Sequence, residues 1–182
     1  LKPESPSSLE TLMVSRLAWL LQRVNAKPLA WAPERPDVRL LGSLTHKVFE
    51  ALFQESRPIP DPQTIGSQLE PHLDVAIRTY APFLRAAQWQ VERKHLAASI
   101  HKAALAWREV LITLKADILG TEEWLYGTLD GLPIHGQADI LLGLPHGRLL
   151  VVDYKRSSAN KRRPRMQKGY DSQANLYRTM LQ

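Results

Sequence analysis

Hydrophobic residues recur at helical spacing over most of the first 117 residues and at strand spacing after them. This pattern predicts helices from Ser7 to about Val24, over 44–55, from about 67 or 70 to 80, and from about 87 to 117. Ser7 and Glu10 have the spacing of a capping box at the start of the first helix. Strands are predicted over 122–129, 133–142 and 148–156, and helical spacing returns from Lys168.

The order of helices, a three-stranded meander and a final helix predicts an α/β protein with an α+β layout. Asp130-Gly131 is a strong hairpin-turn dipeptide between the first two strands. We expect one domain over residues 1–182, with a mainly helical part (1–117) and a part that carries the candidate site (118–182). The chain begins with Leu1 rather than Met, which is compatible with a piece of a longer protein.

Two of the predicted strands carry aspartates that a strand does not need. Asp139 lies in the second strand, and Asp153 and Lys155 lie in the third. Pairing across the turn at 143–147 can bring Asp139 and Asp153 to one point, while Asp153 and Lys155 share a face. Two carboxylates in a partly buried place repel unless a cation lies between them, and hard ions such as Mg²⁺ or Mn²⁺ prefer such ligands. The alternative is an ordinary ion pair at the end of a strand.

Composition and charge narrow the classes of function. The chain has no cysteine, which excludes disulfides, thiol catalysis and cysteine-ligated metal sites. No apolar run is long enough to cross a bilayer and no secretory signal is visible, so we expect a cytoplasmic protein without a membrane partner. The net charge of +6 equals the charge of one segment without acids, formed by Arg156, Lys161, Arg162, Arg163, Arg165 and Lys168. This segment favours a polyanionic substrate. A solvated loop is the simplest explanation, but the position of the segment directly after the third strand makes contact with phosphate groups an equal alternative.

Several short motifs together resemble one family. Gly136-x-x-Asp139, Val151-Val-Asp153-Tyr-Lys155 and Gln173-x-x-x-Tyr177 resemble the motifs of the PD-(D/E)XK nuclease superfamily, with closest similarity to its RecB-type branch. That branch includes the nuclease domains of helicase–nucleases and the CRISPR-associated adaptation nucleases. The segments 6–10 and 41–46, which end in Glu10 and His46, resemble N-terminal helices of AddB-like proteins.

The resemblance implies a restriction-endonuclease-like core, in which helices flank a mixed sheet, with a helical N-terminal extension. It implies that Asp139, Asp153, His46 and the Tyr154 carbonyl bind Mg²⁺ or Mn²⁺, and that Lys155 is the catalytic lysine. Gln173 and Tyr177 match a motif that helps to order the site and bind DNA. The cysteines that hold an iron–sulfur cluster in many relatives are missing, so no such cluster is expected.

The resulting hypothesis is a metal-dependent DNA nuclease, an exonuclease in recombination, repair or foreign-DNA processing, with a helicase domain or subunit as a candidate partner. The rivals are a catalytically inactive DNA-binding or scaffolding module and an RNA-processing nuclease of the same fold. Single residues also have plainer interpretations: a surface position for His46, core packing for Tyr177 and solvent exposure for Glu123. The tryptophans Trp89, Trp107 and Trp124 are predicted to lie in the core.

Overall fold

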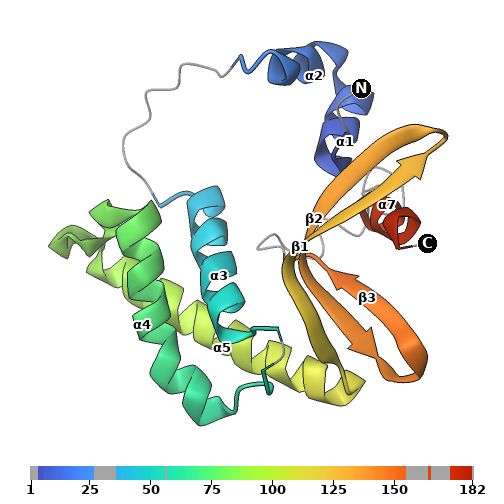
Figure 1. Ribbon diagram of the computed structural model, residues 1–182. Coiled ribbons are helices and arrows are strands. Elements are labelled where there is room, and N and C mark those ends of the chain that lie inside the picture. Colours follow the sequence, from blue (N-terminus) through green and yellow to red (C-terminus); the bar gives the residue numbers. More distant parts are fainter. Residues whose placement is uncertain (1–3, 27–35, 56, 155–163, 165–172, 182) are drawn as a thin grey trace. The chain divides into compact units, whose positions relative to one another are not determined.

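The computed structural model describes residues 4–26, 36–55, 57–154, 164 and 173–181 (Figure 1). The chain divides into two compact units, and each is described by itself. The first unit combines residues Leu1–Ala32, Glu123–Ala138 and Ser157–Gln182. The second combines Pro33–Glu122 and Asp139–Arg156. The predicted single domain over 1–182 therefore stays a prediction.

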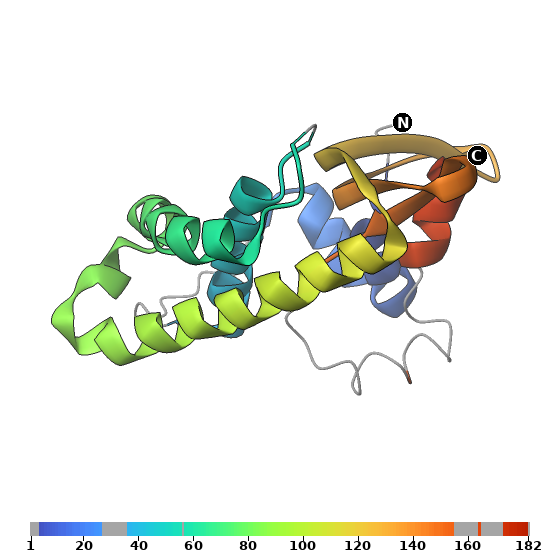
Figure 2. The same cartoon turned by 90° about the horizontal axis from the view of Figure 1, so that it is seen from below.

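Three long helices form most of the second unit. They are α3 (Val38–Leu52), α4 (Pro62–Tyr80) and α5 (Gln90–Leu114), with the short 3₁₀ turns η1 (Pro82–Arg85) and η2 (Ala87–Trp89) before α5. Helix α4 packs against both α3 and α5 (Figures 1 and 2). Helices α3 and α4 begin several residues earlier than predicted, because Asp37 and Asp61 cap them: each carboxylate accepts a backbone N–H three residues on, at 2.7 Å.

The core of the second unit joins these helices to the sheet. Leu44 and Val48 of α3 are fully buried, as are Ile65 and Leu73 of α4. The other buried members are spread over α3, α4, α5 and the strands, and include Phe49, Ile77, Ile100, Leu111, Ile140 and Leu142. Trp89 and Trp107 are only partly buried and pack against this core. Both therefore lie at the margin of the core, whereas the sequence predicts that they lie inside it.

The sheet has three strands in the order β1-β2-β3: β1 (Asp117–Leu129), β2 (Leu132–Leu144) and β3 (Arg148–Val152). Strands β2 and β3 are antiparallel, with a register from Ile140↔Val152 to Leu144↔Arg148. The predicted mixed sheet is wrong for the named strands, since the described residues form an antiparallel meander. The parallel element is an isolated bridge between Glu4 and Ile134. Asp130 and Gly131 have φ of 48° and 79°, so the predicted hairpin turn is confirmed.

Strand β1 changes its pattern of burial near Glu122. Ile118 and Gly120 are buried before this point, whereas Leu125 is buried after it, so the buried positions switch from even to odd numbers. Glu122 itself has φ of 53°, a left-handed conformation that non-glycine residues rarely adopt within a strand. A local irregularity of this kind shifts the strand by one residue and exchanges the side chains on its two faces.

The first unit contains α1 (Pro6–Val14), α2 (Arg16–Arg23), the part of the β1–β2 hairpin from Glu123 to Ala138, and α7 (Gln173–Met180). Helix α1 begins after Ser5, whose Oγ accepts the backbone N–H of Ser8 at 3.2 Å. The prediction that Ser7 caps this helix is therefore wrong, because Pro6 occupies the first helical position and moves the cap to Ser5. The single predicted helix also divides in two, since Ser15 is extended and caps α2. None of the helices described here is long and apolar enough to cross a membrane.

Candidate metal centre

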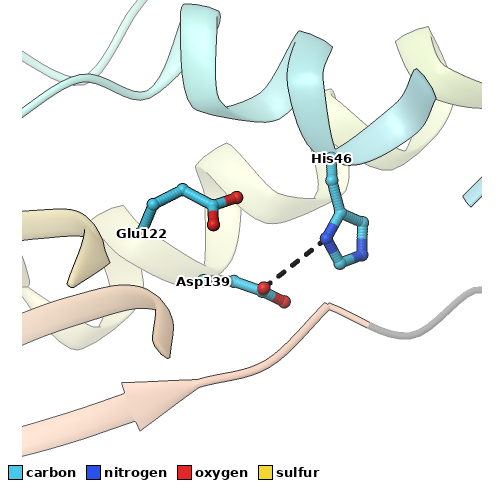
Figure 3. A group of neighbouring side chains, drawn as sticks. All are labelled: His46, Glu122 and Asp139. Atoms are coloured by element: carbon cyan, nitrogen blue, oxygen red, sulfur yellow. Dashed lines mark ion pairs between the residues drawn. The ribbon is translucent and has the colours of Figure 1, made fainter. Parts of the chain in front are cut away.

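Three side chains from three elements of the second unit converge on one point (Figure 3). His46 comes from α3, Glu122 from β1 and Asp139 from β2. Each offers one nitrogen or oxygen atom, and these three atoms all lie within 4.8 Å of one another. All three residues are partly buried, so the group lies at an accessible edge of the fold and not in its core.

The fold places each of the three for a different reason. His46 lies on α3 between Leu44 and Val48, which are both fully buried and fix the helix against the core. Asp139 directly precedes Ile140, another fully buried residue, and so points away from the core face of β2. Glu122 reaches the group at the left-handed position where the pattern of β1 shifts.

The backbone of Tyr154 joins two members of the group. Its amide donates a hydrogen bond to Asp139 Oδ2. Its carbonyl oxygen lies 2.7 Å from His46 Nε2, which is therefore the donor in that bond. The other ring nitrogen, Nδ1, lies 3.5 Å from Asp139 Oδ1 (Figure 3). A histidine that gives one N–H to a carbonyl and turns its other nitrogen to a carboxylate has the arrangement that commonly orients metal-binding histidines.

Burial and neighbouring charges, which partly oppose one another, shift the pKa values of His46 and Glu122. The hydrogen bond and the charge of Asp139, the Tyr154 carbonyl and the charge of Asp153 raise the pKa of His46, although burial opposes them. Burial is the main cause of the raised pKa of Glu122, and the charges of Glu50 and Asp139 raise it further. Lys47 and His46 act in the opposite direction on Glu122. An additional cation would relieve the crowding of carboxylates.

The aromatic ring of Tyr154 anchors the segment that follows β3. It makes edge-on contacts with Phe49 at 5.0 Å and Trp107 at 5.5 Å between ring centroids, and with His46 at 5.9 Å. Its buried hydroxyl has no hydrogen-bond partner of normal geometry among the described protein groups; burial is the main cause of its raised pKa, and the neighbouring Trp107 indole acts in the opposite direction. The ring also lines an apolar cavity of about 410 Å³ between α3 and α5. Packing thus fixes the two backbone groups that contact His46 and Asp139.

The structure brings together only some of the residues predicted from the sequence. His46, Asp139 and the Tyr154 carbonyl are neighbours. Asp153 follows β3 and is half-buried; it lies outside the 4.8 Å group, yet close enough for its charge to act on His46. Its role as a metal ligand stays a prediction. Lys155 and the basic segment fall outside the described residues.

The predicted pair on the last helix lies in the first unit. Gln173 begins α7. Tyr177 is 5% exposed, and its hydroxyl donates a hydrogen bond of 2.7 Å to the backbone oxygen of Gln137. Its ring lies against Gly136, where an added Cβ would come within 2.8 Å of Tyr177 Cε1. These contacts hold α7 on β2, so Tyr177 has a structural task in the first unit whether or not it also acts on DNA.

Glu122 is the member of the group that the sequence did not reveal. Regular alternation along the predicted strand gave no reason to separate it from Glu123, which is exposed as predicted. The only signal was two adjacent acids at the start of a strand, a pattern that is common on surfaces.

The donor set suits a hard divalent ion. One imidazole and two carboxylates offer the nitrogen and oxygen ligands that Mn²⁺ and Mg²⁺ accept, and carboxylate oxygens outnumber nitrogen as those ions prefer. His46, Glu122 and Asp139 would therefore hold such an ion, with the Tyr154 carbonyl beside them.

Comparison with known proteins agrees with this chemistry. The family model described as the PD-(D/E)XK nuclease superfamily matches residues 3–182, nearly the whole chain. No curated protein and no solved structure matches the chain. The match extends over both compact units and includes every member of the candidate metal centre. The chain belongs to the PD-(D/E)XK nuclease superfamily.

Proposed function

We propose that the protein hydrolyses phosphodiester bonds of DNA with the help of Mg²⁺ or Mn²⁺. The observation that carries this proposal is the convergence of His46, Glu122 and Asp139 in a member of a nuclease superfamily. The ion would supply Lewis-acid stabilisation of the negative charge that develops on the phosphate during hydrolysis.

The residues of the chain have separate tasks in this proposal. Asp139 and Glu122 provide the negative charge that attracts the ion, and His46 adds a neutral nitrogen. The Tyr154 carbonyl keeps the Nε2 proton of His46 in place, so that Nδ1 faces the carboxylates. The Tyr154 ring packs against Phe49 of α3, and this contact keeps the Tyr154 backbone next to that helix.

Asp153 and Lys155 belong to the same segment, directly after β3. By the family resemblance, Lys155 would orient the attacking water or neutralise the phosphate, and Asp153 would be a further ligand. The basic segment after Lys155 would contact the phosphate backbone. The exonuclease mode, a role in recombination, repair or foreign-DNA processing, a helicase partner and a RecB-type placement also rest on the resemblance.

Digestion of labelled DNA tests this function. The wild type is incubated with single-stranded and duplex DNA, end-labelled or internally labelled, in Mg²⁺, Mn²⁺ or EDTA. We expect cleavage with metal, none in EDTA, and release of mononucleotides or short products from ends if the mode is exonucleolytic. Asp139→Asn should lower the cleavage rate by a factor of about 100 or more, since one charged ligand is lost. Asp117→Asn, which changes an exposed acid of β1 outside the group, is the matched control.

Three results would overturn the proposal. Cleavage that persists in EDTA would exclude the metal. Cleavage of RNA alone in a parallel digestion would exclude the DNA substrate. Binding of DNA without cleavage in either metal would instead identify an inactive DNA-binding module.

A further inference from the structure

One face of the β1–β2 hairpin in the first unit carries exposed aromatic rings. Trp124 is 49% exposed and Tyr126 is 65% exposed. The prediction that Trp124 lies in the core is therefore wrong. The rings of Trp124 and Tyr126 are 6.4 Å apart and inclined by 26°, and those of Trp124 and His135 are 5.5 Å apart and inclined by 29°. Trp124 is thus nearly parallel to both other rings, and the three together form an aromatic row.

The shift in β1 explains why these rings face outwards. Beyond Glu122 the buried position of β1 is Leu125, which turns inwards, while Trp124 and Tyr126 on either side of it turn outwards. The opposite face of the hairpin is covered within the same unit. An added Cβ at Gly127 would lie 3.1 Å from the backbone of Met180 on α7. The face of the hairpin opposite to Trp124 and Tyr126 is therefore the one that packs against α7.

We propose that this row of rings, Tyr126–Trp124–His135, stacks on unpaired bases of single-stranded nucleic acid. The inference rests on the proposed function in one respect: it assumes that the partner is a nucleic acid. Two of the three flat rings, Trp124 and Tyr126, are exposed and offer faces on which bases stack, and such stacking does not depend on base identity. Tyr126, at the end of the row and the most exposed of the three, offers the freest face for the first base.

The charge of the first unit fits this partner. Its residues include ten lysines and arginines against five aspartates and glutamates, a net charge of +5, whereas the larger second unit has a net charge of +1. All of this excess comes from the sequence segment that contains Lys161 to Lys168. A unit whose sequence combines an aromatic row with a basic segment favours a polyanion with exposed rings over an apolar protein surface, which would gain nothing from the charge.

Binding to two kinds of oligomer separates stacking from charge. Fluorescence anisotropy in EDTA, which prevents metal-dependent cleavage, compares labelled oligo(dT) with an abasic oligomer of the same length. Wild type should bind oligo(dT) more tightly. The Trp124→Ala, Tyr126→Ala double variant should lose roughly 5- to 100-fold in affinity for oligo(dT), the equivalent of one stacked base. Its affinity for the abasic oligomer should change by less than about twofold, because the phosphate contacts remain.

Two matched variants exclude a general loss of structure. Trp124→Phe combined with Tyr126→Phe keeps two rings and should retain most of the affinity. Tyr80→Ala removes a ring of similar exposure, 52%, from the second unit and should bind oligo(dT) as the wild type does. Binding of oligo(rU) tests whether the row also accepts single-stranded RNA. An equal loss of affinity for oligo(rU) and oligo(dT) in the alanine double variant shows that the row binds RNA and DNA alike.

The outcomes separate this inference from the proposed function. Equal affinity of the wild type for oligo(dT) and the abasic oligomer overturns the stacking proposal, even if the protein cleaves DNA. An equal loss for both oligomers in the alanine double variant overturns it as well. Selective binding of oligo(dT) by a protein that never cleaves DNA supports the stacking row and overturns the nuclease proposal alone.

Discussion

Replacing Glu122 by glutamine should stabilise the protein without metal and remove most of the stabilisation that metal provides. The substitution keeps the shape of the side chain and the left-handed backbone, and it removes one negative charge. Without metal this charge is unfavourable, because burial and the neighbouring Asp139 and Glu50 raise the pKa of Glu122. With metal the same charge becomes a ligand, so the effect changes sign.

The size of the stabilisation without metal can be estimated from the distances between the charged groups. The ligand atoms of Glu122 and Asp139 lie within 4.8 Å of each other, so two full charges repel by about 3 kcal/mol at an effective dielectric constant of about 20. Lys47 Nζ, 4.0 Å from Glu122, offsets much of this, but it lies closer to Glu50, at 2.5 Å. A net gain of about 1 kcal/mol in the free energy of unfolding would raise Tm by about 2–4 °C in a protein of this size.

Metal should have the opposite effect. At a Mn²⁺ concentration of about 100 times Kd, the wild type gains about 2.7 kcal/mol in the free energy of unfolding. A variant with about 100-fold weaker binding gains only about 0.4 kcal/mol at the same concentration. The wild-type Tm should therefore rise by several degrees with Mn²⁺, while the Tm of the Glu122→Gln variant should hardly change.

Thermal unfolding followed by circular dichroism at 222 nm, in EDTA and in Mn²⁺, measures both effects. The control is Glu123→Gln, which changes the neighbouring exposed carboxylate and should match the wild type in both conditions. A lower Tm for Glu122→Gln in EDTA would show that the charge is stabilising and refute the electrostatic argument. A full Mn²⁺ shift in this variant would exclude Glu122 as a ligand.

Five further substitutions, at four positions, test the packing and one helix cap. Tyr154→Phe should leave stability equal or raise it by about 1 kcal/mol, because the buried hydroxyl has no partner among the described groups, whereas Tyr154→Ala should cost about 3–5 kcal/mol in chemical denaturation. Gly136→Ala should destabilise the protein, since the new Cβ would meet the Tyr177 ring at 2.8 Å, while Gly42→Ala in α3, with open space around it, should stabilise it by about 0.5–1 kcal/mol. The hydrogen bond from Thr64 lowers the pKa of Asp61 below its ordinary 3.8, so this cap stabilises α4 fully above that pH and loses its effect as the pH falls further. Asp61→Asn keeps the cap and should lose that part of the acid dependence in pH-dependent unfolding, and an unchanged acid profile would contradict this.

The helices, strands and turns could be predicted from the sequence more accurately than the positions at which they begin or become irregular. The meander, the Asp130-Gly131 turn and the main helices follow from hydrophobic period and turn chemistry, which are local properties. The early starts of α3 and α4 were missed because a capping aspartate competes with the first apolar residue as a sign of the helix start. The Asp130-Gly131 turn needs positive φ at two successive residues, and the Asp-Gly dipeptide predicts this because both residue types accept that conformation.

For a similar reason, only part of the candidate metal centre could be predicted from the sequence. His46 and Asp139 could be linked across more than ninety residues only through the family motifs, and the structure places them side by side. Glu122 and the outward face of Trp124 both depend on the shift in β1. A left-handed glutamate inside a strand has no signature in the sequence, because any such position breaks the alternation that the prediction assumes.

The most direct test of the account is calorimetric titration of Mn²⁺ into the wild type, Asp139→Asn and Asp117→Asn. The account predicts saturable binding by the wild type and by Asp117→Asn, and a loss of affinity of about 100-fold or more for Asp139→Asn, since an ion between carboxylates depends on their charge. Absence of saturable Mn²⁺ binding in the wild type, or unchanged affinity in Asp139→Asn, would contradict the claim that His46, Glu122 and Asp139 form a metal centre.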